Sequence, residues 1–90
     1  MLYVLDAEKM MSRSDAHSYL KEQLGFPDYY GNNLDALHDC LTELLDVQVM
    51  FVNTEKVRGD YFDKIMRVFR DSIDENDGLS IVSEEETIEE

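Results

Sequence analysis

Three short apolar runs lie far apart along this chain of 90 residues, and the segments between them have the character of helices. The runs are 2–5, 47–52 and 79–82, and each is long enough for one buried strand. Strands that are joined only through helices favour parallel pairing. The sequence therefore predicts an α/β fold in which a three-stranded parallel sheet packs with about three main helices, in three layers (α/β/α).

Local signals place the three helices. Ser12 or Ser14 is suited to cap the first helix, and Gly25 closes it. The second helix is expected over about 34–45, after a loop that contains glycine and asparagine. A polar connection at 54–60 precedes the third helix. That helix is marked by apolar residues at helical spacing: Phe62, Ile65, Met66, Phe69 and Ile73.

The length suits a single domain, which we expect at 1–83, followed by an acidic C-terminal tail at 84–90. The formal net charge is −13, and no Lys or Arg lies between Glu22 and Glu55. Binding of phosphate groups needs clusters of Lys and Arg, so nucleic acid and anionic membranes are disfavoured as ligands. A basic protein is the partner that this charge favours. An acidic surface that only maintains solubility is the alternative explanation.

The single cysteine, Cys40, excludes an intrachain disulfide and any metal site built from several cysteines. It falls among leucines, which predicts a buried, inert thiol. The first eleven residues have no basic region and reach Asp6 after a short apolar run, so we expect neither a signal peptide nor a membrane span. These observations predict a cytoplasmic protein.

The second helix separates its residues by chemistry. At 3.6 residues per turn the leucines gather on one side, and Asp35, His38, Asp39 and Thr42 gather on the other. Two aspartates four residues apart repel each other, so a surface that keeps them is suited to receive a cation. An ordinary solvated helix face is the competing interpretation. Asp35 is partly explained by its place in the first turn, where the helix dipole favours a carboxylate, whereas Asp39 is not.

Asp35, His38 and Asp39 could also suggest a metal enzyme, since oxygen and nitrogen ligands line one helix face. Their spacing matches no known zinc signature, and the other histidine, His17, lies on a different helix, where a hydrogen-bonded histidine at the core edge is expected. The chain has no HExxH motif, no nucleophile elbow and no glycine-rich phosphate loop. We therefore expect no enzymatic activity, no metal and no cofactor.

The run at 24–42 closely resembles the barstar family of intracellular ribonuclease inhibitors. The resemblance rests on Pro27, on the Tyr-Tyr-Gly at 29–31, on Asn-Leu-Asp-Ala-Leu at 33–37 and on Asp-Cys-Leu-Thr at 39–42. It extends to Ser14, Asp15 and His17 in the first helix and to Val-Phe-Arg-Asp at 68–71 in the last, so it covers about residues 1–83. It implies a barstar-like parallel sheet of three strands flanked by helices.

The resemblance also implies a function. The second helix and its preceding loop would fill the active-site cleft of a basic, extracellular-type (barnase-like) ribonuclease in a 1:1 heterodimer, with the carboxylate of Asp39 standing in for an RNA phosphate. Tyr30 is expected to be more buried than its neighbour Tyr29. Residues expected at the partner interface are Tyr29, Gly31, Asn33, Leu34, Asp35, His38, Asp39, Thr42, Glu43 and Asp71.

The chain departs from the family pattern at three positions in or beside the second helix. His38 and Leu44 stand where the family carries tryptophans, and Glu43 replaces a glycine. Aromatic residues are frequent anchors of protein interfaces, so a smaller contact area is expected. The acidic residues are retained, but the departures leave the target open. A regulatory or immunity module that binds another basic protein is the alternative function.

Overall fold

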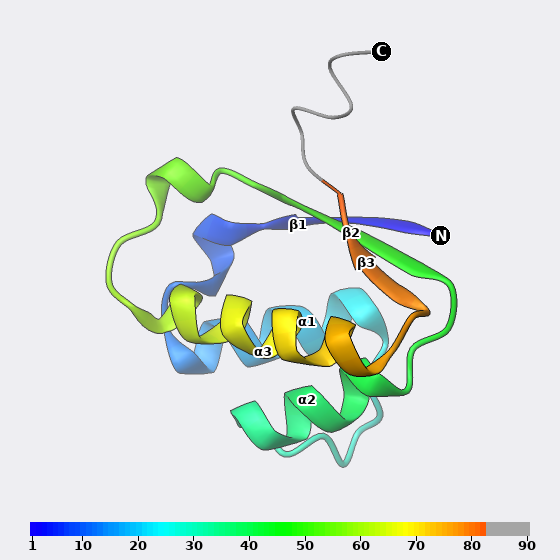
Figure 1. Ribbon diagram of the computed structural model, residues 1–90. Coiled ribbons are helices and arrows are strands. Elements are labelled where there is room, and N and C mark those ends of the chain that lie inside the picture. The colour runs from blue at the N-terminus through cyan, green and yellow to red at the C-terminus, as the bar shows by residue number, and fades with distance from the viewer. Residues whose placement is uncertain (83–90) are drawn as a thin grey trace.

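The computed structural model describes residues 1–82 and contains the predicted parallel sheet (Figure 1). The strand order is β1-β2-β3, and both pairs are parallel, with Leu2–Asp6 beside Gln48–Val52 and Val47–Val49 beside Leu79–Ile81. The expected tail at 84–90 lies outside the described residues. The elements are β1 (Leu2–Asp6), η1 (Ala7–Met10), α1 (Arg13–Leu24), α2 (Leu34–Thr42), β2 (Val47–Val52), η2 (Thr54–Lys56), α3 (Tyr61–Glu75) and β3 (Leu79–Ile81).

The α/β class, the three parallel strands and the three main helices are confirmed, whereas the three-layer arrangement is wrong for the described residues. Figure 1 shows α1, α2 and α3 on one side of the sheet. On the other side Leu2 and Val4 are 49% and 52% exposed. The strand order explains this, because β1 to β2 and β2 to β3 step in the same direction across the sheet. Right-handed crossovers of that kind place their helices on the same face.

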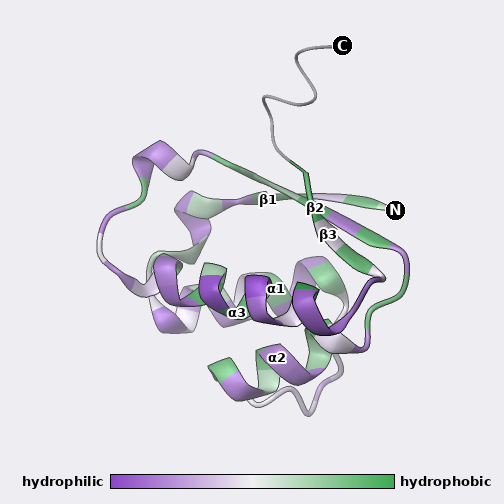
Figure 2. Ribbon diagram, viewed as in Figure 1, coloured by the Kyte–Doolittle hydropathy of each residue, from purple (hydrophilic) through white to green (hydrophobic). Residues whose placement is uncertain are grey.

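The core lies between this covered face and the helices (Figure 2). Alternate residues of the strands point into it, among them Leu5, Val49 and Phe51. The ring of Phe51 meets the rings of Phe62 and Phe69 edge-on, with centroids 5.7 and 5.1 Å apart, which fixes α3 against β2. The expected stripe on α3 is thus confirmed as core, with Met66 and Ile73 partly buried at its edge.

The ends of α1 follow the predicted signals. Of the two candidate caps, Ser12 is used, and its Oγ accepts a hydrogen bond of 3.2 Å from the backbone N–H of Asp15. Gly25 ends the helix in the left-handed conformation, with φ of 70°. This conformation is strained for any residue with a Cβ, which explains the glycine.

Helix α2 ends at Thr42, three residues earlier than the sequence predicts. The reason is a partner from a distant part of the chain: the side-chain amide of Asn76 donates hydrogen bonds of 3.0 and 2.8 Å to the carbonyls of Leu41 and Leu44. In a helix that continued to residue 45, the Leu41 carbonyl would instead accept from the backbone N–H of Leu45. As a result Leu45, which the helical pattern placed on the buried side, is 84% exposed.

Candidate functional site

Helix α2 is held at its start by a side-chain cap and along its length by burial. The Asn33 side-chain oxygen accepts a hydrogen bond of 2.7 Å from the backbone N–H of Ala36. Leu37 and Leu41 are fully buried beneath the helix, and Leu34 packs against the core from its first turn. The helix therefore presents its opposite side from a fixed position.

That opposite side is acidic and exposed. Asp35, Asp39 and Glu43 are all exposed residues of α2 or of its C-terminal cap. Within residues 1–82 the one ion pair joins His38 to Glu75, so none of these three carboxylates is neutralised by a cation of the described chain. An unpaired group of like charges gains free energy when a cationic partner approaches.

Asp39 and Glu43 border a shallow recess of about 540 Å³ between α2 and the loop that follows α1. We name it the Tyr29 recess. Tyr29 stands at its rim and is 89% exposed, an unusual state for a large aromatic side chain. The remaining lining residues are Leu24, Gly25, Phe26, Pro27, Cys40 and Leu44. An apolar floor beneath two carboxylates and an exposed ring is suited to a long cationic side chain.

Cys40 contributes an inert part of this floor. It is half-buried, and burial, together with the nearby carboxylates of Glu43 and Asp39, raises the pKa of its thiol. A thiol with a raised pKa holds little thiolate at neutral pH. This environment agrees with the predicted inert thiol, although Cys40 is half-buried and not fully buried as predicted.

The loop that carries Tyr29 is tied to two helices through its neighbour. Tyr30 is 5% exposed, which confirms that it is the more buried of the two tyrosines. Its hydroxyl lies 2.6 Å from Nδ1 of His17 on α1, and the other ring nitrogen, Nε2, lies 2.7 Å from the hydroxyl of Tyr61 on α3. His17 is thus the hydrogen-bonded core histidine that was expected. Its partner Tyr61 was not foreseen, because nothing near it in sequence points to His17.

Burial sets the protonation of this Tyr30–His17–Tyr61 chain. Desolvation lowers the pKa of His17, and the charge of Arg13 lowers it further. Desolvation raises the pKa of the Tyr61 hydroxyl, and it raises the pKa of the Tyr30 hydroxyl further still. All three groups are therefore neutral at pH 7, and the neutral imidazole donates from one nitrogen and accepts at the other.

Three other residues predicted at the interface have internal partners. His38, predicted to face the partner between the two aspartates, is 32% exposed, and its Nε2 lies 2.9 Å from the carboxylate of Glu75 on α3. The Thr42 hydroxyl donates a hydrogen bond of 2.9 Å to the carbonyl of Asp39. Asn33, as described, caps α2.

Asp71 is exposed on α3, and Gly31 is exposed in the loop. The role of each in binding stays a prediction.

No three metal-ligating side chains gather into a possible metal site among residues 1–82. Within the same range no helix is both long and apolar enough to cross a membrane.

Two comparisons with known proteins point to the same family. The family described as "Barstar (barnase inhibitor)" matches residues 1–84. A protein of Bacillus subtilis (strain 168), named "Putative ribonuclease inhibitor YrdF", is 37% identical over 87 residues, which cover 90% of this chain and 96% of that protein. Together with the parallel sheet and its three helices, these matches establish that the chain belongs to the barstar family.

Proposed function

We propose that this protein is a non-catalytic inhibitor that binds a basic, barnase-like ribonuclease of the extracellular type and occludes its active site. The observation that carries the proposal is the exposed pair of carboxylates, Asp35 and Asp39, on the anchored helix α2, which have no cationic partner within residues 1–82. Family membership and the name of the Bacillus subtilis relative support a ribonuclease as the target. The complex is proposed to be a 1:1 heterodimer that forms in the cytoplasm.

The proposed mechanism is mimicry of the RNA backbone. A ribonuclease must hold a phosphate with cationic side chains, and a carboxylate on a fixed helix can accept the same charge-assisted hydrogen bonds. Asp39 would enter the phosphate site and Asp35 would add a second acidic contact. Tyr29 would pack against the wall of the cleft, beside Gly31, Asn33 and Leu34. Because α2 and its loop are anchored before binding, little conformational entropy would be lost on association.

A second candidate is a regulatory or immunity module for a different basic protein. The observation that favours it is the absence of large aromatic side chains at positions 38 and 44, where the family carries tryptophans. In this chain the first of these positions, His38, is engaged with Glu75. Such an interface would keep the acidic face and lose part of the apolar contact with a ribonuclease.

Inhibition of purified barnase by the wild-type protein and by Asp39→Asn tests the proposal. The matched control is Glu55→Gln, which removes one negative charge from η2, an exposed turn in the connection between β2 and α3. Loss of a charge-assisted hydrogen bond is expected to raise the dissociation constant by about 10- to 100-fold for Asp39→Asn and to leave Glu55→Gln near wild type. Equal effects of the two substitutions would reject the mimicry mechanism. Capture of a non-ribonuclease basic protein from the native organism, without barnase inhibition, would favour the second candidate.

A further inference from the structure

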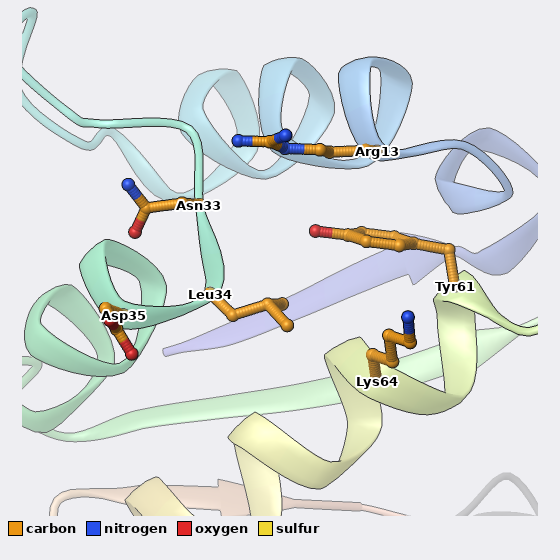
Figure 3. A pocket seen from close by; sticks show the side chains of 6 residues that line it. All are labelled: Arg13, Asn33, Leu34, Asp35, Tyr61 and Lys64. Atoms are coloured by element: carbon orange, nitrogen blue, oxygen red, sulfur yellow. The ribbon is translucent and has the colours of Figure 1, made fainter.

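A second recess, of about 400 Å³, opens where the first turns of α1, α2 and α3 converge (Figure 3). We name it the Arg13 recess. It holds two cationic side chains, Arg13 from α1 and Lys64 from α3, in a protein whose net charge is −13. The other lining residues are Asn33, Leu34, Asp35 and Tyr61. Two cations against one carboxylate give this small region a positive excess inside an acidic surface.

Both cations are exposed, and neither forms an ion pair within residues 1–82. The one ion pair formed within residues 1–82 joins His38 to Glu75, so neither Arg13 nor Lys64 is paired with a described carboxylate, not even with Asp35 in the same recess. Their charges are therefore available to a ligand that brings its own negative group.

The recess has a fixed aromatic wall. The Tyr61 hydroxyl lies 2.7 Å from Nε2 of the buried His17, which holds the ring in place. The ammonium group of Lys64 lies 6.0 Å from the centroid of that ring, and Figure 3 shows Arg13 on the other side of it. The guanidinium of Arg13 extends from α1 towards Asn33. The two cations thus flank a ring that is anchored before any partner binds.

The Arg13 recess adjoins the surface proposed to face the ribonuclease. Arg13 also lines a neighbouring hollow with Gly31 and Asn32, so it stands beside the loop that leads into α2. Asp35 lines the recess itself, and Asp39 follows one helical turn later, about 6 Å along the axis of α2. A partner that engages Asp39 would therefore extend over Arg13.

We propose that the Arg13 recess receives an aspartate or glutamate side chain of the ribonuclease, so that recognition is bipolar. Carboxylates of α2 would meet cations of the enzyme, and Arg13 and Lys64 would meet an acidic side chain at the rim of its cleft. Guanidinium and ammonium groups are well suited to bind a carboxylate. An RNA phosphate is disfavoured as the occupant by the net charge of −13. The inference rests on the proposed function, because it names a further contact of the same interface.

Two double variants with equal charge changes test it. Arg13→Gln/Lys64→Gln empties the recess, and Arg67→Gln/Arg70→Gln removes two exposed arginines of α3 that line a separate hollow with Thr54. Both changes make the net charge more negative by two. Long-range attraction to a basic enzyme should therefore strengthen in both, and any weakening must come from a lost local contact.

The measurement is the binding kinetics of each variant with purified barnase, with circular dichroism and thermal unfolding as checks of the fold. We expect Arg13→Gln/Lys64→Gln to raise the dissociation constant about tenfold or more, mainly through faster dissociation. Arg67→Gln/Arg70→Gln should bind as tightly as wild type or more tightly. Lys64→Gln alone, which leaves Arg13 and the His17 contacts unchanged, should show part of the loss and guards against a folding defect in the double variant.

Each other outcome overturns a distinct claim. If both double variants bind alike while Asp39→Asn is weakened, the recess makes no contact and the proposed function stands. If Arg13→Gln/Lys64→Gln is weakened while Asp39→Asn is not, phosphate mimicry fails and the recess remains a contact. Wild-type protein that does not bind barnase at all would remove both proposals for that enzyme.

Discussion

Nδ1 of His17 lies 2.6 Å from the hydroxyl of Tyr30, and this short contact joins α1 to the loop that presents Tyr29. The two residues are 13 positions apart and both are buried. Because the second nitrogen of the same imidazole meets Tyr61, one side chain connects the loop to two helices. A surface loop with an exposed aromatic residue is thereby positioned from inside the protein.

Replacing this imidazole should destabilise the fold. His17→Phe would leave the buried Tyr30 hydroxyl without its partner, and an unsatisfied buried hydroxyl costs about 1–3 kcal/mol. Tyr61→Phe removes the second contact and retains the first, so a smaller loss, about 1 kcal/mol, is expected. Urea unfolding at pH 7 measures both. If both variants unfold at the same urea concentration as wild type, the two hydrogen bonds make no net contribution to the free energy of unfolding.

The same histidine predicts how stability changes with pH. Burial lowers the pKa of His17 in the fold below its ordinary value of 6.5, so the unfolded chain binds more protons wherever the two states differ. The contribution of His17 to the free energy of unfolding should therefore be fully present above pH 6.5. It should decline as the pH falls from 6.5 towards the lowered pKa. Asp6, whose pKa is lowered chiefly by the Asn53 side chain, acts in a separate window below 3.8.

His17→Gln provides the control for this pH dependence. The variant should lose the decline that begins near pH 6.5 and keep the more acidic one due to Asp6. A decline that persists unchanged in His17→Gln would assign it to another group.

Asn76 should be the residue that most strongly fixes the end of α2. Its amide donates to the carbonyls of Leu41 and Leu44, and its oxygen accepts from the backbone N–H of Gly78 at 2.9 Å. Asn76→Ala is expected to cost about 2–3 kcal/mol, and Asn76→Asp at least as much because a carboxylate would face two carbonyl oxygens. In a domain of this size, that loss lowers Tm by roughly 10 °C or more. The neighbouring Asp77→Asn should leave Tm within about 2 °C of wild type.

Ser72 offers a stabilising substitution. Its hydroxyl is buried in α3 and has no hydrogen-bond partner among residues 1–82. Ser72→Ala removes the unsatisfied group and inserts the best helix former, so a gain of about 0.5–1 kcal/mol is expected in urea unfolding. Ser18→Ala, at an exposed position in the middle of α1, provides the matched control for helix propensity alone. A gain in Ser72→Ala no larger than in Ser18→Ala would mean that the buried hydroxyl carries no penalty.

Association with a basic ribonuclease should slow as salt rises. The chain carries −13, and the Debye length shortens from about 10 Å at 0.1 M to about 3 Å at 1 M. Stopped-flow measurements with barnase between 0.05 and 0.5 M salt should show a clear fall in the association rate and a smaller change in dissociation. An association rate independent of salt would contradict electrostatic attraction as the source of fast binding.

Local signals were sufficient for much of the fold. Gly25 ends α1, Asn33 begins α2, and continuous apolar runs became the strands, because each of these features depends on residues close in the chain. The acidic side of α2 was equally readable, since helical periodicity alone separates Asp35 and Asp39 from the leucines.

Contacts between distant residues were beyond such signals. The end of α2 depends on Asn76, 34 positions after Thr42, and the pairing of His17 with Tyr61 spans 44 positions. The Arg13 recess exists because the packing of three helices on one face of the sheet brings Arg13 and Lys64 to the same place. Periodicity and capping report the conformation of each segment, whereas the meeting of two segments depends on strand order and packing, which no local pattern contains.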